Sequence, residues 1–157
     1  MIRVEVFDDN LSWKKKIKKT SIFFNKVLSL FPEKYKFKKK NISFSLLLSD
    51  NKKIKELNKK FRKKNKSTDI LSFPLNKKIN KNKYYLGDII ISYQFMNKPK
   101  SINNLNFKKK VIRIFIHGFL HLLGYDHLRE KDYIKMYNEE LKIFELVDRK
   151  IDKIIKI

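Results

Sequence analysis

The sequence predicts an α+β fold over residues 1–157, a small mixed β-sheet of about four strands packed with helices. Four short segments alternate apolar and polar residues, as half-buried strands do. The segments between and after them repeat apolar residues at helical spacing. No linker or internal repeat divides the chain, and its 157 residues suit one domain with its own core.

The first 30 residues predict a strand and a helix. Residues 1–7 alternate apolar and polar side chains, which indicates a strand. Ser12 follows a short polar turn and is a favourable residue to cap a helix. Apolar residues then recur on one side to about residue 30. Pro32 is expected to stop this helix, because proline cannot continue one.

The next segment predicts a second strand and a short helix. Residues 42–48 alternate again, and Asp50 is expected to cap the helix that follows them. The lysines of this helix form its solvated face. Its inward-facing residues are predicted to be Ile54, Leu57 and Phe61.

Two further strands are expected at residues 69–75 and 84–92, joined by a polar, basic link that reads as an exposed hairpin loop. A helical segment begins near Ser92, is interrupted around Pro99 and resumes over residues 106–123. Apolar side chains cover most of the circumference of that last part, which is typical of a buried helix.

A final amphipathic helix is predicted from about Arg129. Its apolar side is expected to carry Tyr133, Tyr137, Leu141, Phe144, Ile151 and Ile155.

The only three histidines of the chain, His117, His121 and His127, lie in the stretch IHGFLHLLGYDH. The first two are four residues apart and share one face of the buried helix. Gly124 can end the helix in a left-handed conformation and turn the chain back, so that His127 swings in as a third ligand. Three imidazoles at about 2.0–2.1 Å suit Zn²⁺, and three protein ligands plus water is the catalytic arrangement.

The same histidine spacing occurs in the metzincin proteases, where a glutamate follows the first histidine as general base. Gly118 occupies that position here and cannot move a proton. The spacing therefore favours a metal site on a buried helix but argues against proteolysis.

Composition limits the class of protein. The formal net charge is +23, from 39 basic and 16 acidic residues, and such a field attracts polyanions. AT-rich codons for the abundant residues offer compositional drift as another source of the lysines. The absence of cysteine excludes disulfides and thiolate metal sites. No signal peptide or apolar run of about 20 residues is present, which predicts a soluble, cytoplasmic protein without a membrane partner.

The stretch HGFLHLLGYDH resembles the signature HGxLHLxGYDH of the bacterial YbeY endoribonucleases, which are rRNA maturation factors. LNKKFRKKNKSTDILSFP, at residues 57–74, is similar to the LN…R…TDVLSFP stretch of that family. LGDIIIS, at residues 86–92, is similar to its LGDIxIS strand. The three matches follow the order of the family and extend from residue 57 to about 130. Residues 1–50 agree only in predicted organisation.

The resemblance implies an α+β domain that holds one zinc ion through His117, His121 and His127. It also implies a hydrolase of single-stranded RNA that matures the 3′ end of small-subunit rRNA and contributes to ribosome quality control. The expected partners are rRNA and the ribosome, with no DNA substrate. Arg62 aligns with an arginine of the active-site cleft of the family, so Arg62 and His117 are the candidate catalytic residues.

Arginine suits that role because its guanidinium can clamp a phosphate with two parallel hydrogen bonds. The alternative for Arg62 is a surface arginine at a helix end. Around the metal, Asp69 and Ser72 are expected to orient groups, although Asp69 alternatively ends a strand. Asp126 is expected either to accept from an imidazole or to complete the turn. Tyr125 either stacks on a base or packs against the helix.

Three functions stay open on the residues alone. The first is a zinc-dependent endoribonuclease. The second is a ribosome-associated RNA-binding protein with a structural zinc, in which Asp126 or another carboxylate is the fourth ligand. The third is a metalloprotease with a distant glutamate as base, which the glycine at position 118 and the basic charge count against.

Overall fold

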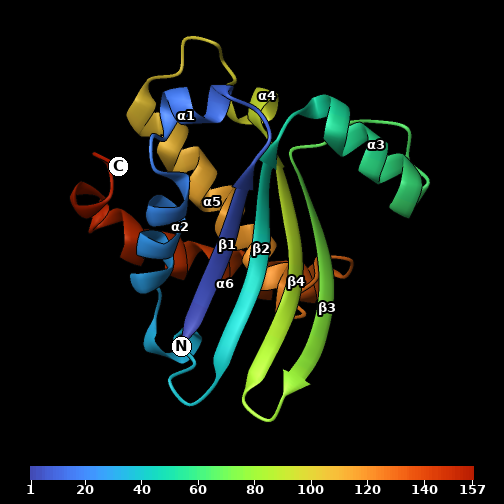
Figure 1. The fold of residues 1–157 in the computed structure, drawn as a ribbon, viewed down its shortest axis with the longest axis vertical. Helices are drawn as coiled ribbons and strands as arrows, with labels where there is room; N and C mark the ends of the chain where they lie inside the picture. Colours follow the sequence, from blue (N-terminus) through green and yellow to red (C-terminus); the bar gives the residue numbers. More distant parts are fainter.

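Four strands form one mixed sheet in the order β1-β2-β4-β3 (Figure 1). They are β1 (Ile2–Asp8), β2 (Asn41–Ser49), β3 (Ile70–Asn80) and β4 (Lys83–Ser92). The neighbours β1 and β4 both run parallel to β2, and β3 pairs antiparallel with β4. The computed structural model describes all residues from 1 to 157 and confirms the predicted α+β class with a small mixed sheet.

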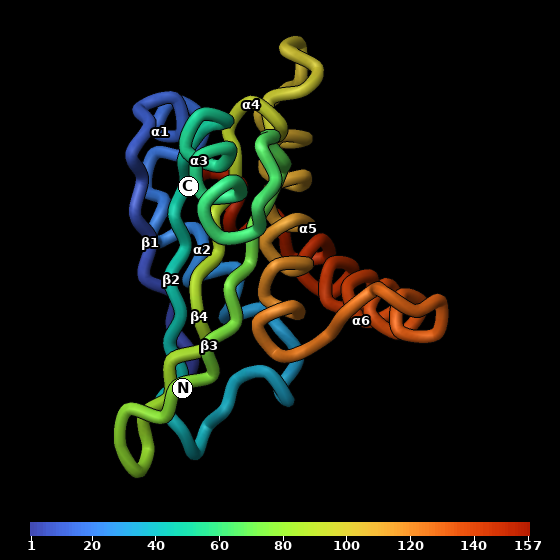
Figure 2. Tube along the Cα trace, turned by 90° about the vertical axis from the view of Figure 1, so that its right-hand side faces the viewer, coloured from blue at the N-terminus to red at the C-terminus, as the bar shows by residue number.

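Helices cover the two faces of the sheet unequally (Figures 1 and 2). The helices are α1 (Ser12–Lys16), α2 (Thr20–Ser29), α3 (Asn51–Arg62), α4 (Tyr93–Met96), α5 (Asn104–Leu122) and α6 (Glu130–Asp148). Both α2 and α5 pack on one face, α6 packs against α5, and α3 lies against the opposite face. No helix combines the length and the apolar composition that crossing a bilayer requires.

The core lies between the sheet and α5. Alternate residues of β2 are buried on this side, and they are Ile42, Phe44, Leu46 and Leu48. Phe115 of α5 stacks on Phe44 with ring centroids 5.9 Å apart and meets Phe24 of α2 at 5.0 Å. Most of α5 is buried, as its apolar circumference predicted.

The helix predicted from residue 12 to about 30 is broken in two. Ile17 takes an extended conformation (φ −131°, ψ 102°) and buries its side chain completely, so the chain changes direction between α1 and α2. Ser12 does not act as the cap. The side-chain oxygen of Asn10 instead accepts a hydrogen bond from the Ser12 amide at 3.0 Å.

Two other boundaries also differ from the prediction. The link between the third and fourth strands is mostly strand, because β3 continues to Asn80 and only the tip is a turn. The last helix ends at Asp148, before Ile151 and Ile155. The chain then turns and buries Ile154 in the core, which a continuing helix would not allow.

The inward face expected for α6 is confirmed only in part. Phe144 packs against the core as predicted, but Tyr133 and Tyr137 are exposed. The fully buried residues of this helix are Met136, Ile143 and Val147. Two carboxylates, Glu139 and Glu140, are buried on this helix.

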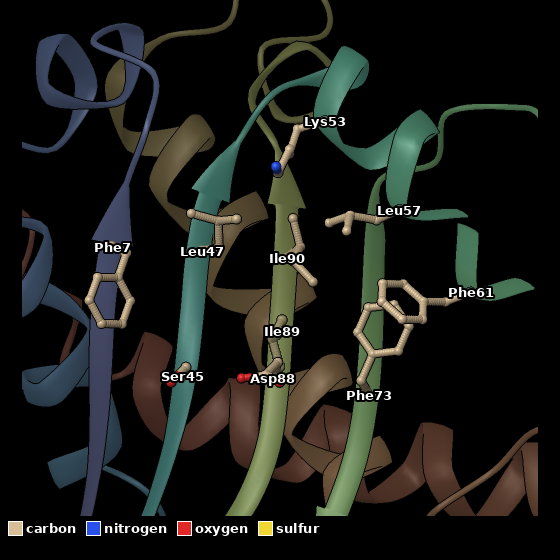
Figure 3. A pocket seen from close by; sticks show the side chains of 10 residues that line it. All are labelled: Phe7, Ser45, Leu47, Lys53, Leu57, Phe61, Phe73, Asp88, Ile89 and Ile90. Carbon is tan, nitrogen blue, oxygen red and sulfur yellow. The ribbon is translucent and has the colours of Figure 1, made fainter. Parts of the chain in front are cut away.

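The face of the sheet that α3 covers only in part contains a groove of about 400 Å³ (Figure 3). Asp50 caps α3 as predicted, since its carboxylate accepts from the Lys53 amide at 3.0 Å. Ile54 is buried, but Phe61 is 58% exposed on the wall of the groove, which corrects its predicted inward placement. Opposite α3, the sheet contributes Phe7, Leu47, Phe73 and Ile90 to the lining.

We predict that Phe115→Ala lowers the free energy of unfolding by about 3–5 kcal/mol, because it leaves a cavity among closely packed rings. Ile22→Ala is the control, since Ile22 is 55% exposed on α2, and its effect should stay within about 0.5 kcal/mol. Guanidinium unfolding monitored by circular dichroism measures both. Similar midpoints for the two variants would show that the ring cluster does not hold α5 to the sheet.

Candidate metal centre

The three histidines converge at the C-terminal end of α5. His117 and His121 lie one turn apart on this helix, and His127 lies in the loop before α6. One nitrogen from each ring lies within 4.8 Å of those of the other two, and the Nε2 atoms of His117 and His121 are 3.1 Å apart. The structure therefore brings together all three predicted ligands.

A glycine turn returns the chain to the site. Gly124 adopts a positive φ of +96° directly after α5. Its amide donates to the carbonyl of His121, and the Tyr125 amide donates to the carbonyl of Leu120, both at 3.0 Å. This bonding pattern is the Schellman motif that a left-handed glycine permits at a helix end. It leaves the rings of His121 and His127 with centroids 4.9 Å apart.

A second glycine, Gly118, lies where α5 packs against the sheet. A Cβ atom at position 118 would lie 2.6 Å from Cδ1 of Ile70 and 3.2 Å from the side chain of Ile89. Gly118 therefore lets α5 pack against strands β3 and β4 without displacing the side chain of Ile70. The neighbouring His117 is thereby held next to the edge strand of the sheet.

The nitrogens that face away from the cluster have fixed partners. His117 Nδ1 lies 2.9 Å from a carboxylate oxygen of Glu140, and His121 Nδ1 lies 2.9 Å from the main-chain carbonyl of Tyr125. The Nε of Arg113 also donates to Glu140, at 3.2 Å. Because both acceptors require a proton on Nδ1, they leave the Nε2 lone pairs directed at the cluster.

The pKa shifts of His121 and Glu140 favour the protonation states that suit a bound cation. Burial and the proximity of His117 and His127 lower the pKa of His121, so that its imidazole stays neutral. Burial raises the pKa of Glu140, but the bonds from His117 and Arg113 outweigh burial and leave that pKa below its usual value. A neutral imidazole at His121 and an ionised carboxylate beside His117 fit a divalent metal ion.

Glu140 and Arg113 were not anticipated from the sequence. Glu140 lies 23 residues after His117, and only the packing of α6 on α5 brings the two together. One local signal was available. Glu140 lies four residues after Met136 and three before Ile143, so helical periodicity assigns a carboxylate to the buried face. A buried carboxylate requires a partner.

The other candidates near the turn have local roles. Asp126 accepts from the amide of His127 at 2.7 Å and so completes the loop, while Glu140 is the carboxylate that meets an imidazole. Tyr125 packs against the core. Asp69 accepts from the Ile70 amide at 2.8 Å and thus begins strand β3.

Arg62 contacts the edge strand β3, and β3 in turn contacts α5, the helix that carries His117 and His121. Its Nη2 donates to the carbonyl of Ser72 at 2.7 Å, and its guanidinium lies 5.5 Å from the ring centroid of Phe73. The hydroxyl of Ser72 lies 3.4 Å from the carbonyl of Gly118, next to His117. Arg62 therefore lies at β3, with one of its donors already engaged.

Comparison with known proteins identifies relatives of the whole chain. Residues 8–148 match the family model described as endoribonuclease YbeY. The endoribonuclease YbeY of Pelagibacter ubique is 57% identical over 152 residues, which cover 96% of this chain and 99% of that protein. The one from Persephonella marina is 44% identical over 107 residues, covering 67% and 70%.

A solved structure agrees with these matches. The solution structure of a Thermotoga maritima protein aligns with a TM-score of 0.55 and 25% identity, over 98% of this chain and 93% of that one. The histidine signature, the order of the strands and the extent of these matches lead to one assignment. The chain belongs to the endoribonuclease YbeY family.

Proposed function

We propose that this chain is a zinc-dependent endoribonuclease that cleaves single-stranded RNA in the cytoplasm. Its substrate is rRNA, with maturation of the 3′ end of small-subunit rRNA and ribosome quality control as its roles and the ribosome as its partner. The names of its relatives support action on RNA. The observation that carries the proposal is the convergence of three imidazoles, two of which, at His117 and His121, have their outer nitrogens held by Glu140 and Tyr125.

His117, His121 and His127 would hold the metal ion. Bound there, zinc supplies Lewis-acid chemistry, polarising a phosphoryl oxygen and lowering the pKa of a water molecule. The carboxylate of Asp126 bonds the main chain and that of Glu140 bonds Nδ1 of His117, which supports a fourth position that is open to water or substrate. Such a donor set suits a catalytic site better than a closed structural one.

Arg62 would bind the phosphate. One N–H of its guanidinium donates to the Ser72 carbonyl, and the remaining N–H groups can donate to the negatively charged phosphate oxygens of the substrate. The contact with Ser72 and the ring of Phe73 fixes the direction of the side chain. A clamp oriented in advance stabilises the charge that develops on the phosphate during cleavage. The net charge of +23 would draw the RNA to the protein.

His121→Ala should bind zinc far more weakly, by more than the roughly 10–100-fold that loss of an outer partner causes. Elemental analysis of protein purified without a metal-affinity tag measures occupancy. The matched control is Asp126→Asn, which keeps an oxygen acceptor for the His127 amide and should keep its zinc. Full occupancy in His121→Ala contradicts a three-ligand site. Loss of zinc from Asp126→Asn would favour a structural zinc with Asp126 as fourth ligand.

Glu140→Gln should weaken zinc binding by about 10–100-fold, because the amide oxygen can still accept from Nδ1 of His117 but lacks the negative charge that raises the basicity of the imidazole. Glu139→Gln is a matched control, since Glu139 is equally buried on α6 but bonds Tyr35 and Lys34. Competition with a chromophoric chelator gives both affinities. Equal zinc affinities in the two variants would show that the carboxylate of Glu140 serves only the fold.

Arg62→Lys should slow cleavage by about 10²–10³-fold, because lysine keeps the charge but loses the forked donors. Zinc content should not change, since Arg62 contacts Ser72 and Phe73 rather than a histidine. Single-turnover cleavage of a single-stranded RNA, with zinc measured in the same sample, tests this expectation. Arg3→Lys, on an exposed arginine of β1, is the control. Wild-type cleavage by Arg62→Lys would exclude the clamp.

A further inference from the structure

A cavity of about 220 Å³ adjoins the histidines and has an aromatic wall that the proposed chemistry does not use. It is lined by His117, His127, Tyr133, Met136, Tyr137 and Glu140. Two of these are candidate metal ligands and a third orients one of them. A group bound in the cavity would therefore lie directly beside the cleavage site.

The aromatic wall is open to solvent. Tyr133 is 54% exposed and Tyr137 is 43% exposed, although both were expected to face the core. They lie one turn apart on α6, with ring centroids 6.1 Å apart and planes only 15° from parallel. Two nearly parallel, exposed rings offer flat faces on which another planar group can stack.

The aromatic wall is also connected to the candidate metal ligands through Arg113 and Glu140. The guanidinium of Arg113 lies 5.9 Å from the ring centroid of Tyr137, and its Nε donates to Glu140 at 3.2 Å. Glu140 in turn accepts from His117. One chain of contacts thus connects a tyrosine ring of the wall to a candidate metal ligand.

We propose that Tyr133 and Tyr137 form a base-stacking subsite that holds one unpaired nucleobase of the RNA beside the histidines. The identity of this ligand rests on the endoribonuclease function proposed above. The cavity is smaller than the roughly 300–1,000 Å³ of a drug-sized pocket, which suits a single planar base. The only charged side chain that lines the cavity besides the histidines is the carboxylate of Glu140, which suits a base better than a phosphate.

The subsite gives a physical reason for single-strand specificity. A base can stack on a tyrosine only after it leaves its own stack, which costs a few kcal/mol in a duplex and much less in a single strand. Aromatic faces accept every base, so the subsite selects unpaired nucleotides without reading a particular sequence.

The test compares two single-stranded 2′-O-methyl RNA probes of equal length and charge, one complete and one with abasic positions. Their binding to the zinc-loaded protein is measured by fluorescence anisotropy, with probe integrity checked afterwards. Tyr133→Ala and Tyr137→Ala should each weaken binding of the complete probe by roughly fivefold or more, the loss expected for one base stack. Binding of the abasic probe should not change. Tyr133→Phe keeps the ring and should bind both probes as the wild type does.

Ile134→Ala is the matched control, because Ile134 is 51% exposed on the same turn and does not line the cavity. It should bind both probes normally. Unchanged binding of the complete probe by the two alanine variants would overturn the subsite, as would an equal loss for both probes. A wild-type protein that fails to cleave RNA but shows the base-dependent tyrosine effect would refute the proposed function and leave the subsite intact.

Discussion

The close approach of α5 to the sheet is the constraint on which the metal centre depends. Gly118 removes the side chain that would otherwise meet Ile70, and the rings around Phe115 hold the helix in place. A helix fixed at this depth cannot rotate without opening the core, so the face that carries His117 and His121 is set by packing alone. Burial of apolar surface thereby supplies the positional precision that a donor set needs.

The next helix completes what α5 begins. After the glycine turn, α6 packs back against α5 and brings Glu140 to His117. Burying that carboxylate and the adjacent Glu139 is costly, and the cost is offset by Arg113 and His117 on one side and by Lys34 on the other. The buried face of α6 therefore carries two charged pairs, although apolar residues would be less costly to bury there. The pair at Glu140 orients the candidate metal ligand His117.

How far the sequence predicts this structure depends on the range of the interactions. Alternation along β2 and the apolar circumference of α5 are local, and both were predicted, as was the histidine cluster from its spacing and Gly124. The break at Ile17 was missed because its extended conformation follows from burial against distant residues. Phe61 and Tyr133 were expected inside from their helical spacing, yet both side chains are more than half exposed, because no further element packs over them. Glu140 was missed because its partner lies on another helix.

The exposed tyrosines and the cavity have a common structural origin. Figure 2 shows α6 beginning away from the sheet and running back toward the core, so its first turns extend beyond the other elements. Residues on those turns have nothing to pack against on one side, and aromatic rings there remain accessible instead of entering the core. The same extension leaves space between the start of α6 and the end of α5, where the histidines lie.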